Sequence, residues 1–217
     1  QISESILNDN NITIIGAGSS KTKIINSGGS FAYRNTSQPA TAIGLDNGGM
    51  TFLTAGNGTA DANISFTAAM GITNAGQVTK PKNPAFRAYY SVNNTWSLGG
   101  GVTFVFDTTE YNIGSCYNTS NGRFTAPVAG VYQFNFYTIV LGNYLNAVIS
   151  FRRNGGAPTS GFNVYFSPYY TSTGWSNVVY TTSLYLNDGD YVYMVNGGDT
   201  TNYHGDDWSS FSGYLVG

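Results

Sequence analysis

The sequence has little charge, one cysteine, one histidine and no long hydrophobic run. Charged residues make up 9% of the 217 residues, against about 25% in an average soluble protein. No stretch approaches the ~18 uninterrupted apolar residues that a membrane-spanning helix needs. The net charge of −2 gives no electrostatic footprint for nucleic acid or anionic lipid. We therefore expect a protein that neither binds nucleic acid nor inserts into a membrane.

Catalysis finds little support, because the reactive side chains are few. The single cysteine, Cys116, excludes an internal disulfide framework and is most often a small buried hydrophobe. A Ser-His-Asp triad would have to use His204, whose neighbours Gly205-Asp206-Asp207 resemble a solvated loop rather than a buried partner. Paired glycosidase carboxylates would have to come from 11 acids scattered mostly in turns. The sequence predicts that the chain is not an enzyme.

What the chain has in abundance is aromatic residues, at 15%, and glycine, at 28 residues. Disordered chains are usually poor in aromatics and rich in charge, so disorder is excluded. Thr, Tyr, Val and Phe favour strands, whereas the best helix formers are scarce. The composition therefore predicts an all-β protein. Because the chain begins at Gln1 rather than Met, we also expect a processed or truncated product.

A sharp change in aromatic content divides the chain. Residues 1–83 hold 4 of the 33 aromatic residues (13 Phe, 3 Trp and 17 Tyr), and residues 84–217 hold the other 29. The join is Lys80-Pro81-Lys82-Asn83-Pro84, where two prolines disfavour both a helix and a central strand. We therefore expect a β-rich shaft or connector at residues 1–83 and a head domain at residues 84–217, joined by an extended linker without helix.

The first segment consists of short strand-like pieces separated by turns such as Asn26-Ser27-Gly28-Gly29. Few of these pieces carry side chains large enough for 83 residues to bury a core alone. Such a segment normally completes its core with partner chains or stacked repeats. No repeat period is visible, so partner chains are the favoured explanation, and an irregular linker is the alternative.

The second segment is strongly patterned for strands. Val102–Phe106 and Val131–Tyr137 alternate, which places Tyr132, Phe134 and Phe136 on one face. We expect these three side chains and Phe151 to be buried. Strands at this density with turns between them predict a sandwich or a barrel.

Three motifs in the second segment are similar to one known family. They are Gly122-Arg123-Phe124-Thr125-Ala126-Pro127-Val128-Ala129-Gly130-Val131-Tyr132-Gln133-Phe134, Leu186-Asn187-Asp188-Gly189-Asp190-Tyr191-Val192 and Phe211-Ser212-Gly213-Tyr214-Leu215, preceded by an opening Pro84-Ala85-Phe86. In this order they resemble the globular head of the C1q/TNF family. The resemblance implies a jelly-roll sandwich that assembles as a homotrimer, with calcium bound near the head in some members.

The part before the head resembles something else. No Gly-X-Y run occurs in residues 1–83, so the family's collagen stalk is absent. Instead, Leu53–Thr59 and Ile72–Pro81 resemble the shafts of bacteriophage tail fibres, which run into a C1q-like tip through a "G-x-V-T-x-P" junction. This resemblance implies a structural and receptor-binding phage fibre, located in the virion as a tail or capsid fibre. Its partners would be other virion proteins and a host-surface glycan or protein.

Two further hypotheses belong to other classes. One is a secreted or cell-surface C1q-like module that binds its ligands with the same head. The other is a glycan-degrading fibre tip, which would release soluble sugar from host envelope material. The shaft-like first segment and the missing collagen favour the fibre over the secreted module.

Aromatic residues in turn-like sequence are the candidate ligand-binding residues. Tyrosine and tryptophan rings stack on sugar faces while neighbouring polar groups meet hydroxyls. Trimer interfaces also favour aromatics, so this alternative stays open. The residues in question are Tyr169, Tyr170, Trp175, Tyr203 and Trp208.

An acidic loop supplies the candidate metal ligands. Calcium prefers carboxylate and carbonyl oxygens, whereas one Cys and one His are too few for the Cys and His ligand set that zinc prefers. The candidates are Asp199, Asp206 and Asp207, and the alternative is a loop that is merely solvated. We expect no other cofactor.

Overall fold

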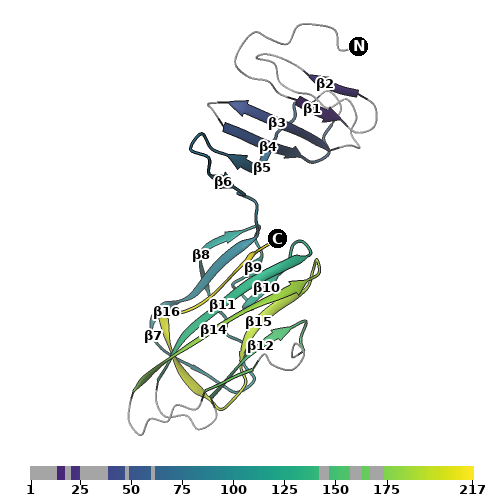
Figure 1. The fold of residues 1–217 in the computed structure, drawn as a ribbon. Coiled ribbons are helices and arrows are strands. Elements are labelled where there is room, and N and C mark those ends of the chain that lie inside the picture. Colours follow the sequence, from purple (N-terminus) through teal and green to yellow (C-terminus); the bar gives the residue numbers. More distant parts are fainter. Residues whose placement is uncertain are drawn as a thin grey trace. The chain divides into compact units, whose positions relative to one another are not determined.

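The computed structural model describes residues 14–17, 21–24, 39–46, 49–59, 62–141, 147–156, 163–166 and 174–217 (Figure 1). Every regular element in these ranges is a β-strand, and all strand pairs are antiparallel. No helix in the described ranges is long and apolar enough to cross a membrane. The chain divides into two compact units, Gln1–Lys82 and Asn83–Gly217.

The first unit is a single six-stranded sheet in the order β2-β1-β3-β4-β5-β6. Its described residues bury only small side chains, those of Ala40, Ala42 and Ala55. The larger apolar side chains on β4 and β5 are half-exposed. The strands are β1 (Ile14–Ala17), β2 (Lys21–Ile24), β3 (Ala40–Asp46), β4 (Gly49–Ala55), β5 (Thr67–Ile72) and β6 (Val78–Thr79).

The connector between the units forms a turn rather than the extended linker that its prolines predict. Residues 81–82 make the turn and Asn83 a bend, and no helix is present in residues 80–84. The Asn83 side chain donates a hydrogen bond to the Leu215 carbonyl at 2.8 Å, and the Leu215 N–H donates to the Pro84 carbonyl at 3.0 Å. The end of the connector is thereby fixed to the last strand of the head.

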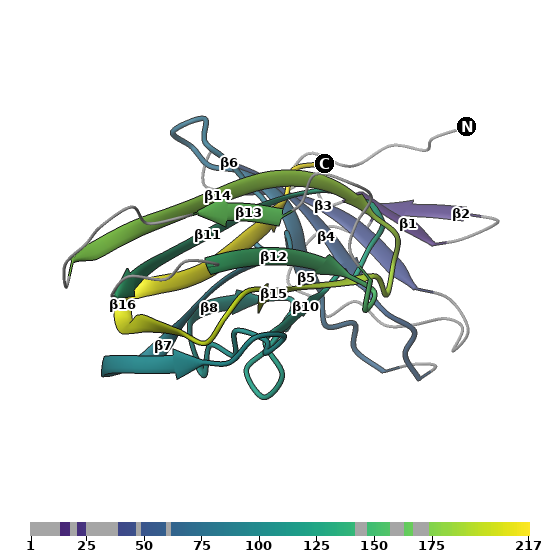
Figure 2. The ribbon, with the colours of Figure 1, turned by 90° about the horizontal axis from the view of Figure 1, so that it is seen from below.

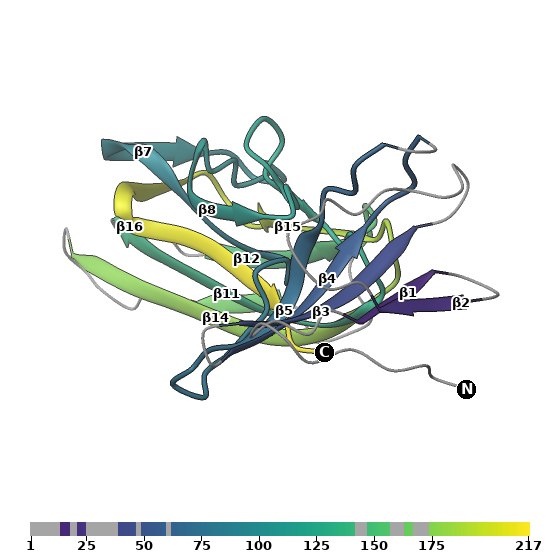
Figure 3. The same cartoon turned by 90° about the horizontal axis from the view of Figure 1, so that it is seen from above.

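The head, residues 83–217, is a sandwich of two five-stranded sheets (Figures 2 and 3). The first head sheet has the order β14-β11-β16-β7-β8, and the second has the order β13-β12-β15-β10-β9. The first comprises β7 (Ala85–Leu98), β8 (Thr108–Ile113), β11 (Gly130–Leu141), β14 (Trp175–Leu186) and β16 (Thr201–Leu215). The second comprises β9 (Tyr117–Asn118), β10 (Arg123–Thr125), β12 (Ala147–Arg153), β13 (Asn163–Phe166) and β15 (Tyr191–Asn196).

Aromatic rings fill the space between the two head sheets. Tyr132, Phe134 and Phe136 are buried on β11 as their alternation predicts, and Phe151 is buried on β12. The rings of Tyr132 and Phe134 contact Phe124, and those of Phe134 and Phe151 contact Phe211. Phe86 contacts both Phe124 and Phe211, and Phe136 meets Phe104 edge to face. Such ring contacts add to the free energy gained by burying the aromatic surface.

Val102–Phe106 is a correction to the predicted strands. This segment makes one isolated bridge, between Thr103 and Val195, and is otherwise irregular. Phe104 and Phe106 are nevertheless buried, because the alternation places both rings toward the core. The alternation therefore predicts which side chains of this segment are buried. It does not predict the hydrogen bonds of a full strand, which the segment lacks.

Candidate functional site

Two exposed tryptophans and the only histidine form a ring cluster on the first head sheet. The ring centroids of Trp175 and His204 lie 4.7 Å apart with an interplanar angle of 34°. Trp208 completes the cluster, 5.7 Å from His204 and 6.4 Å from Trp175. Trp175 is 54% exposed and Trp208 is 48% exposed. The sequence analysis names both tryptophans, and the structure brings them together.

The cluster forms over the end of β11. Trp175 begins β14 on one side of β11, and Trp208 lies on β16 on the other side. Ile139 of β11 faces outward by strand alternation, with Tyr137, yet it is buried. The histidine was expected only as an exposed loop residue, although its spacing of four from Trp208 places both on one strand face.

A bulge in β16 positions Trp208. Asp206 pairs with Tyr90 and Ser210 pairs with Tyr89, so residues 207–209 are extra on β16. Asp206 has φ of 58°, a left-handed conformation that aspartate tolerates better than most residues. β-bulges commonly redirect side chains next to functional sites.

Buried hydroxyls fix the base of this bulge. The Ser209 side chain donates to the His204 carbonyl at 2.5 Å and lies 2.7 Å from the Thr138 hydroxyl. Ser209 and Thr138 are both buried. The imidazole Nδ1 of His204 lies 2.9 Å from the Gly205 carbonyl. Hydrogen bonds therefore hold the backbone beneath the exposed rings in place. This lowers the conformational entropy that is lost when a ligand orders the rings.

The same sheet face carries further exposed apolar side chains toward its other end. Val179 is 67% exposed and Tyr185 is 58% exposed on β14, and Val131 and Tyr214 are exposed on β11 and β16. Val131 and Tyr185 are direct cross-strand partners. We call these four residues the exposed sheet face.

Tyr203 corrects the predicted set of loop aromatics. It lies on β16 with 0% exposure, and its ring meets Phe104 edge to face at 4.8 Å. Alternation along β16 turns residue 203 inward and residue 204 outward, which the turn-like sequence around it concealed. Tyr203 is a core residue. Tyr169 and Tyr170 lie outside the described residues.

The predicted metal ligands do not come together. No group of three or more His, Cys, Asp or Glu side chains in the described ranges is placed to hold a metal ion. Asp199 follows β15 in a turn, Asp206 takes the left-handed position of the bulge, and the Asp207 carboxylate lies 3.5 Å from Arg87. Asp206 and Asp207 lie in strand β16 and not in the acidic loop that the sequence predicts. Asp199 lies outside this strand and is thereby separated from them.

Cys116 is buried, as a lone cysteine most often is. Its thiol lies 3.4 Å from the Ile113 carbonyl. Burial raises the pKa of the thiol to about 11, so the reactive thiolate is scarce at neutral pH. Cys116 therefore contributes to the packing of the head.

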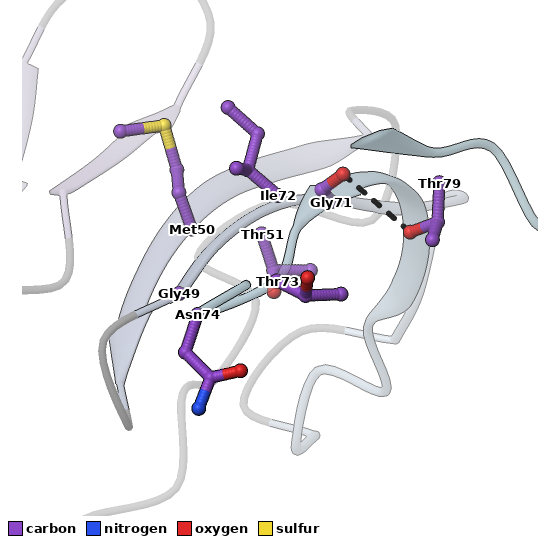
Figure 4. Close-up of a pocket in the computed structure, with 8 residues that line it drawn as sticks. All are labelled: Gly49, Met50, Thr51, Gly71, Ile72, Thr73, Asn74 and Thr79. Atoms are coloured by element: carbon purple, nitrogen blue, oxygen red, sulfur yellow. Dashed lines mark hydrogen bonds between the residues drawn. The ribbon is translucent and has the colours of Figure 1, made fainter. Parts of the chain in front are cut away.

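A pocket of about 300 Å³ lies on the first unit, near the ends of β4, β5 and β6 (Figure 4). Met50 and Ile72, which pair across β4 and β5, extend on the same side of the sheet. The Thr79 hydroxyl lies 3.5 Å from the Gly71 carbonyl at its rim. The lining is Gly49, Met50, Thr51, Gly71, Ile72, Thr73, Asn74 and Thr79. It includes no titratable side chain.

Comparison with known proteins places the head in a family. The C1q domain model matches residues 85–216, more than half of the chain. Complement C1q tumor necrosis factor-related protein 3 of Mus musculus is 33% identical over 116 residues, covering 52% of this chain and 44% of the mouse protein. Caprin-2 of Danio rerio is 29% identical over 136 residues, covering 60% of this chain and 14% of that protein. The chain thus matches less than half the length of these relatives.

A solved structure shares the fold. Eiger TNF from S. frugiperda superposes with a TM-score of 0.51 at 12% identity, covering 63% of this chain and 94% of that one. At this identity the likeness shows the fold alone, which is the jelly-roll sandwich that the motifs of the second segment imply.

The comparisons overturn the expected virion location. The matched relatives are animal C1q/TNF-related proteins, so the placement in a phage tail or capsid fibre is wrong. That placement came from residues 53–81, whose Gly, Thr, Asn and Ala are common in many β-rich segments. Composition of this kind is a weak indicator of origin, and the alternative of a C1q-like binding module fits the relatives better.

Proposed function

The chain belongs to the C1q domain family, and from this premise we propose that it is a secreted binding module that works as a homotrimer and catalyses no reaction. Its ligand is a surface glycan or protein, bound at the Trp175–His204–Trp208 cluster. The observation that carries the proposal is the exposure of two tryptophans held together at one end of a rigid sheet.

The position of the cluster within the head supports this role. The chain enters the head at Ala85, which pairs with Tyr214 at one end of the first head sheet. His204 pairs with Thr95 near the opposite end. The cluster thus lies at the end of the first head sheet away from Ala85, among connecting segments of the kind that commonly carry binding residues.

The chemistry of the cluster favours a ligand with an apolar, ring-like surface. Tryptophan offers a large apolar face and one N–H donor, and it is enriched in the residues that dominate binding energy. The neighbouring Asn177 and Asp207 are exposed and supply polar contacts at the margin. A sugar ring, with an apolar C–H face and hydroxyl edges, matches this combination.

The exposed sheet face supports the homotrimer. Exposed apolar side chains on one sheet face are typical of association surfaces. Val131, Tyr185 and Tyr214 lie at one end of this face, and hydrogen-bonded polar side chains separate them from Val179. Interfaces combine apolar side chains with polar ones in this way. We assign this face to assembly and the ring cluster to the ligand.

Assembly is tested by sedimentation of the whole chain. The expected wild-type mass is three times 23.2 kDa. Val179→Asp is expected to give monomers, because it buries an unpaired charge within the proposed interface. Val128→Asp places the same charge at an exposed valine outside this face and should leave the trimer intact. A wild-type monomer would contradict the assembly proposal.

Ligand binding is tested with Trp175→Ala and Trp208→Ala on a panel of immobilised glycans and surface proteins. Each variant should lose at least about tenfold in affinity, as residues at binding hot spots do. Trp175→Phe and Trp208→Phe keep a ring and should retain part of the affinity. Loss of binding together with loss of the trimer would assign the rings to the interface instead. Unchanged binding with an intact trimer would refute the site.

The location has its own test. The protein should be found in the medium rather than inside the cells of its natural source. Exclusive recovery from the cell interior would contradict secretion without affecting the binding assignment.

A further inference from the structure

Two arginines flank one tyrosine on the outward face of the second head sheet. Val192 and Met194 of β15 point into the core, so Tyr193 points outward. Arg152 of β12 is the direct cross-strand partner of Tyr193. On the other side, the guanidinium of Arg123 of β10 lies 5.4 Å from the Tyr193 ring centroid. β12, β15 and β10 are adjacent in the sheet, so Arg152, Tyr193 and Arg123 form one row across it.

Arg123 is held in place by aromatic contacts rather than by a carboxylate. Its guanidinium lies 4.5 Å from the centroid of the Tyr191 ring, which stacks with Tyr193 at a centroid distance of 6.0 Å and an angle of 22°. A cation over a ring face is attracted by the ring quadrupole, and this contact leaves the guanidinium N–H groups available. Arg123 is exposed, so these donors face solvent.

The other arginines of the head have carboxylate partners. Arg87 pairs with Glu110 at 2.5 Å and with Asp207 at 3.5 Å, and Arg153 pairs with Asp190 at 2.6 Å. Within the described part of the chain, neither Arg123 nor Arg152 lies within ion-pair distance of a carboxylate. The two arginines without such a partner are thus the two that share a row with Tyr193.

Charge is distributed unequally between the two head sheets. The strands of the second head sheet contain three arginines and no Asp or Glu. The strands of the first head sheet contain one arginine, Arg87, and three acids, Glu110, Asp206 and Asp207. Asp190, directly before β15, pairs with Arg153. The charges that this sheet presents without a carboxylate partner are therefore those of Arg123 and Arg152, although the whole chain has a net charge of −2.

We propose that the row Arg123–Tyr193–Arg152 binds an acidic glycan, with one sulfate or carboxylate group at each guanidinium and a sugar ring over the tyrosines. Arginine recognises such planar or tetrahedral oxyanions through paired N–H donors. The two arginines are separated by two strand spacings, about 10 Å, which suits a polymer with repeated charges rather than one small anion. A flat sheet face also admits an extended chain more readily than a compact ligand.

This site goes beyond the proposed function, because it lies on the opposite sheet from the ring cluster and from the assembly face. Binding at it does not require a trimer, although three copies would raise the avidity for a long polymer. The two proposals can therefore fail independently of one another.

The test compares binding of the whole chain to dextran sulfate and to uncharged dextran, which share a backbone and differ in charge. Arg123→Gln and Arg152→Gln should each weaken binding to dextran sulfate by about tenfold, and the double variant by about a hundredfold. The salt dependence of binding should become shallower with each arginine removed. Arg87→Gln removes the same charge from the first head sheet and should change the affinity less than about twofold. Trp175→Ala should leave it unchanged.

Three results would overturn the proposal. The first is a double variant that binds dextran sulfate as tightly as the wild type. The second is equal binding of dextran and dextran sulfate by the wild type. The third is tight binding of polyglutamate or single-stranded DNA with none of dextran sulfate, which would assign the row to an acidic peptide or a nucleic acid. Thermal unfolding of each variant verifies that the head is folded.

Discussion

Gly213 lies directly against the ring of Phe134 in the centre of the head. A Cβ atom at position 213 would lie 2.5 Å from Cδ1 and 2.8 Å from Cε1 of that ring, and 3.0 Å from Cε1 of Phe86. Gly213 of β16 pairs with Phe134 of β11, so the missing side chain is what lets the two strands and their rings pack closely. The glycine in Phe211-Ser212-Gly213-Tyr214-Leu215 thus has a steric cause.

Gly213→Ala is expected to destabilise the head by about 1–3 kcal/mol, because the added methyl group overpacks a filled core. Phe134 is 1% exposed, so its ring is enclosed by the core. Gly99→Ala is the matched control, since its Cβ would make only an ordinary contact of 3.5 Å with Val102. Urea unfolding measures both. Equal stability of the two variants would show that the core adjusts to the methyl group.

Phe134→Ala makes the opposite change at the same contact and should cost about 3–5 kcal/mol of unfolding free energy. The ring lies 5.2 Å from that of Phe124 and 5.5 Å from that of Phe151, so its removal leaves a large cavity. Tyr111→Ala, at an exposed ring on β8, serves as the control and should cost less than about 1 kcal/mol. A loss below about 1 kcal/mol for Phe134→Ala would mean that the core collapses into the space.

The sequence predicts the head well because its three motifs imply the fold and its central strand alternates from Tyr132 to Phe136. Tyr132, Phe134 and Phe136 occur at every second position, and only one assignment of faces buries all three. Val102–Phe106 alternates equally well but makes one bridge, because alternation follows from burial and not from hydrogen bonding. The first segment lacks bulky residues, and there the pattern carries little information about which segments pair.

The candidate site was predicted in part, for related reasons. Trp175 and Trp208 are 33 positions apart in the sequence, and nothing local indicates that β14 and β16 bring them together across β11. Tyr203 and His204 are adjacent, yet Tyr203 lies in the core and His204 on the surface. Which of the two is buried depends on the face of the sheet toward which each side chain of the strand points. That Arg123 and Arg152 lie in one row can be seen only from the cross-strand register. No sequence motif predicts this arrangement.

Cys116 should resist alkylation in the folded protein. Burial raises the pKa of its thiol to about 11, so at a pH of about 8 nearly all of it is the unreactive neutral form. Iodoacetamide labelling followed by mass spectrometry should therefore be slow under native conditions and rapid in urea. Rapid labelling of the native protein would show that the loop around Ile113 opens often enough to expose the thiol.

Asp190 should make stability depend on pH in the acid range. Its carboxylate accepts hydrogen bonds from the Asn154 side chain at 2.6 Å, the Asn187 N–H at 2.8 Å and the Arg153 guanidinium at 2.6 Å. These contacts, that of Asn154 foremost, lower the pKa of Asp190 from 3.8 to about 2. The ionised form is therefore favoured by folding, and protonation removes this contribution to stability.

The direction of the pKa shift determines the pH range in which the effect on stability is measured. Because the folded pKa is below the unfolded one, the contribution is complete above about pH 4 and falls as the pH drops toward about 2. Asp190→Asn should lower the melting temperature at pH 6 and flatten its fall between about pH 4 and pH 2. Asp188→Asn removes a charge from the same turn and should keep the wild-type slope. A wild-type slope in Asp190→Asn would show that other carboxylates govern acid unfolding, and that the bonds joining β12 to the turn before β15 contribute little to the fold.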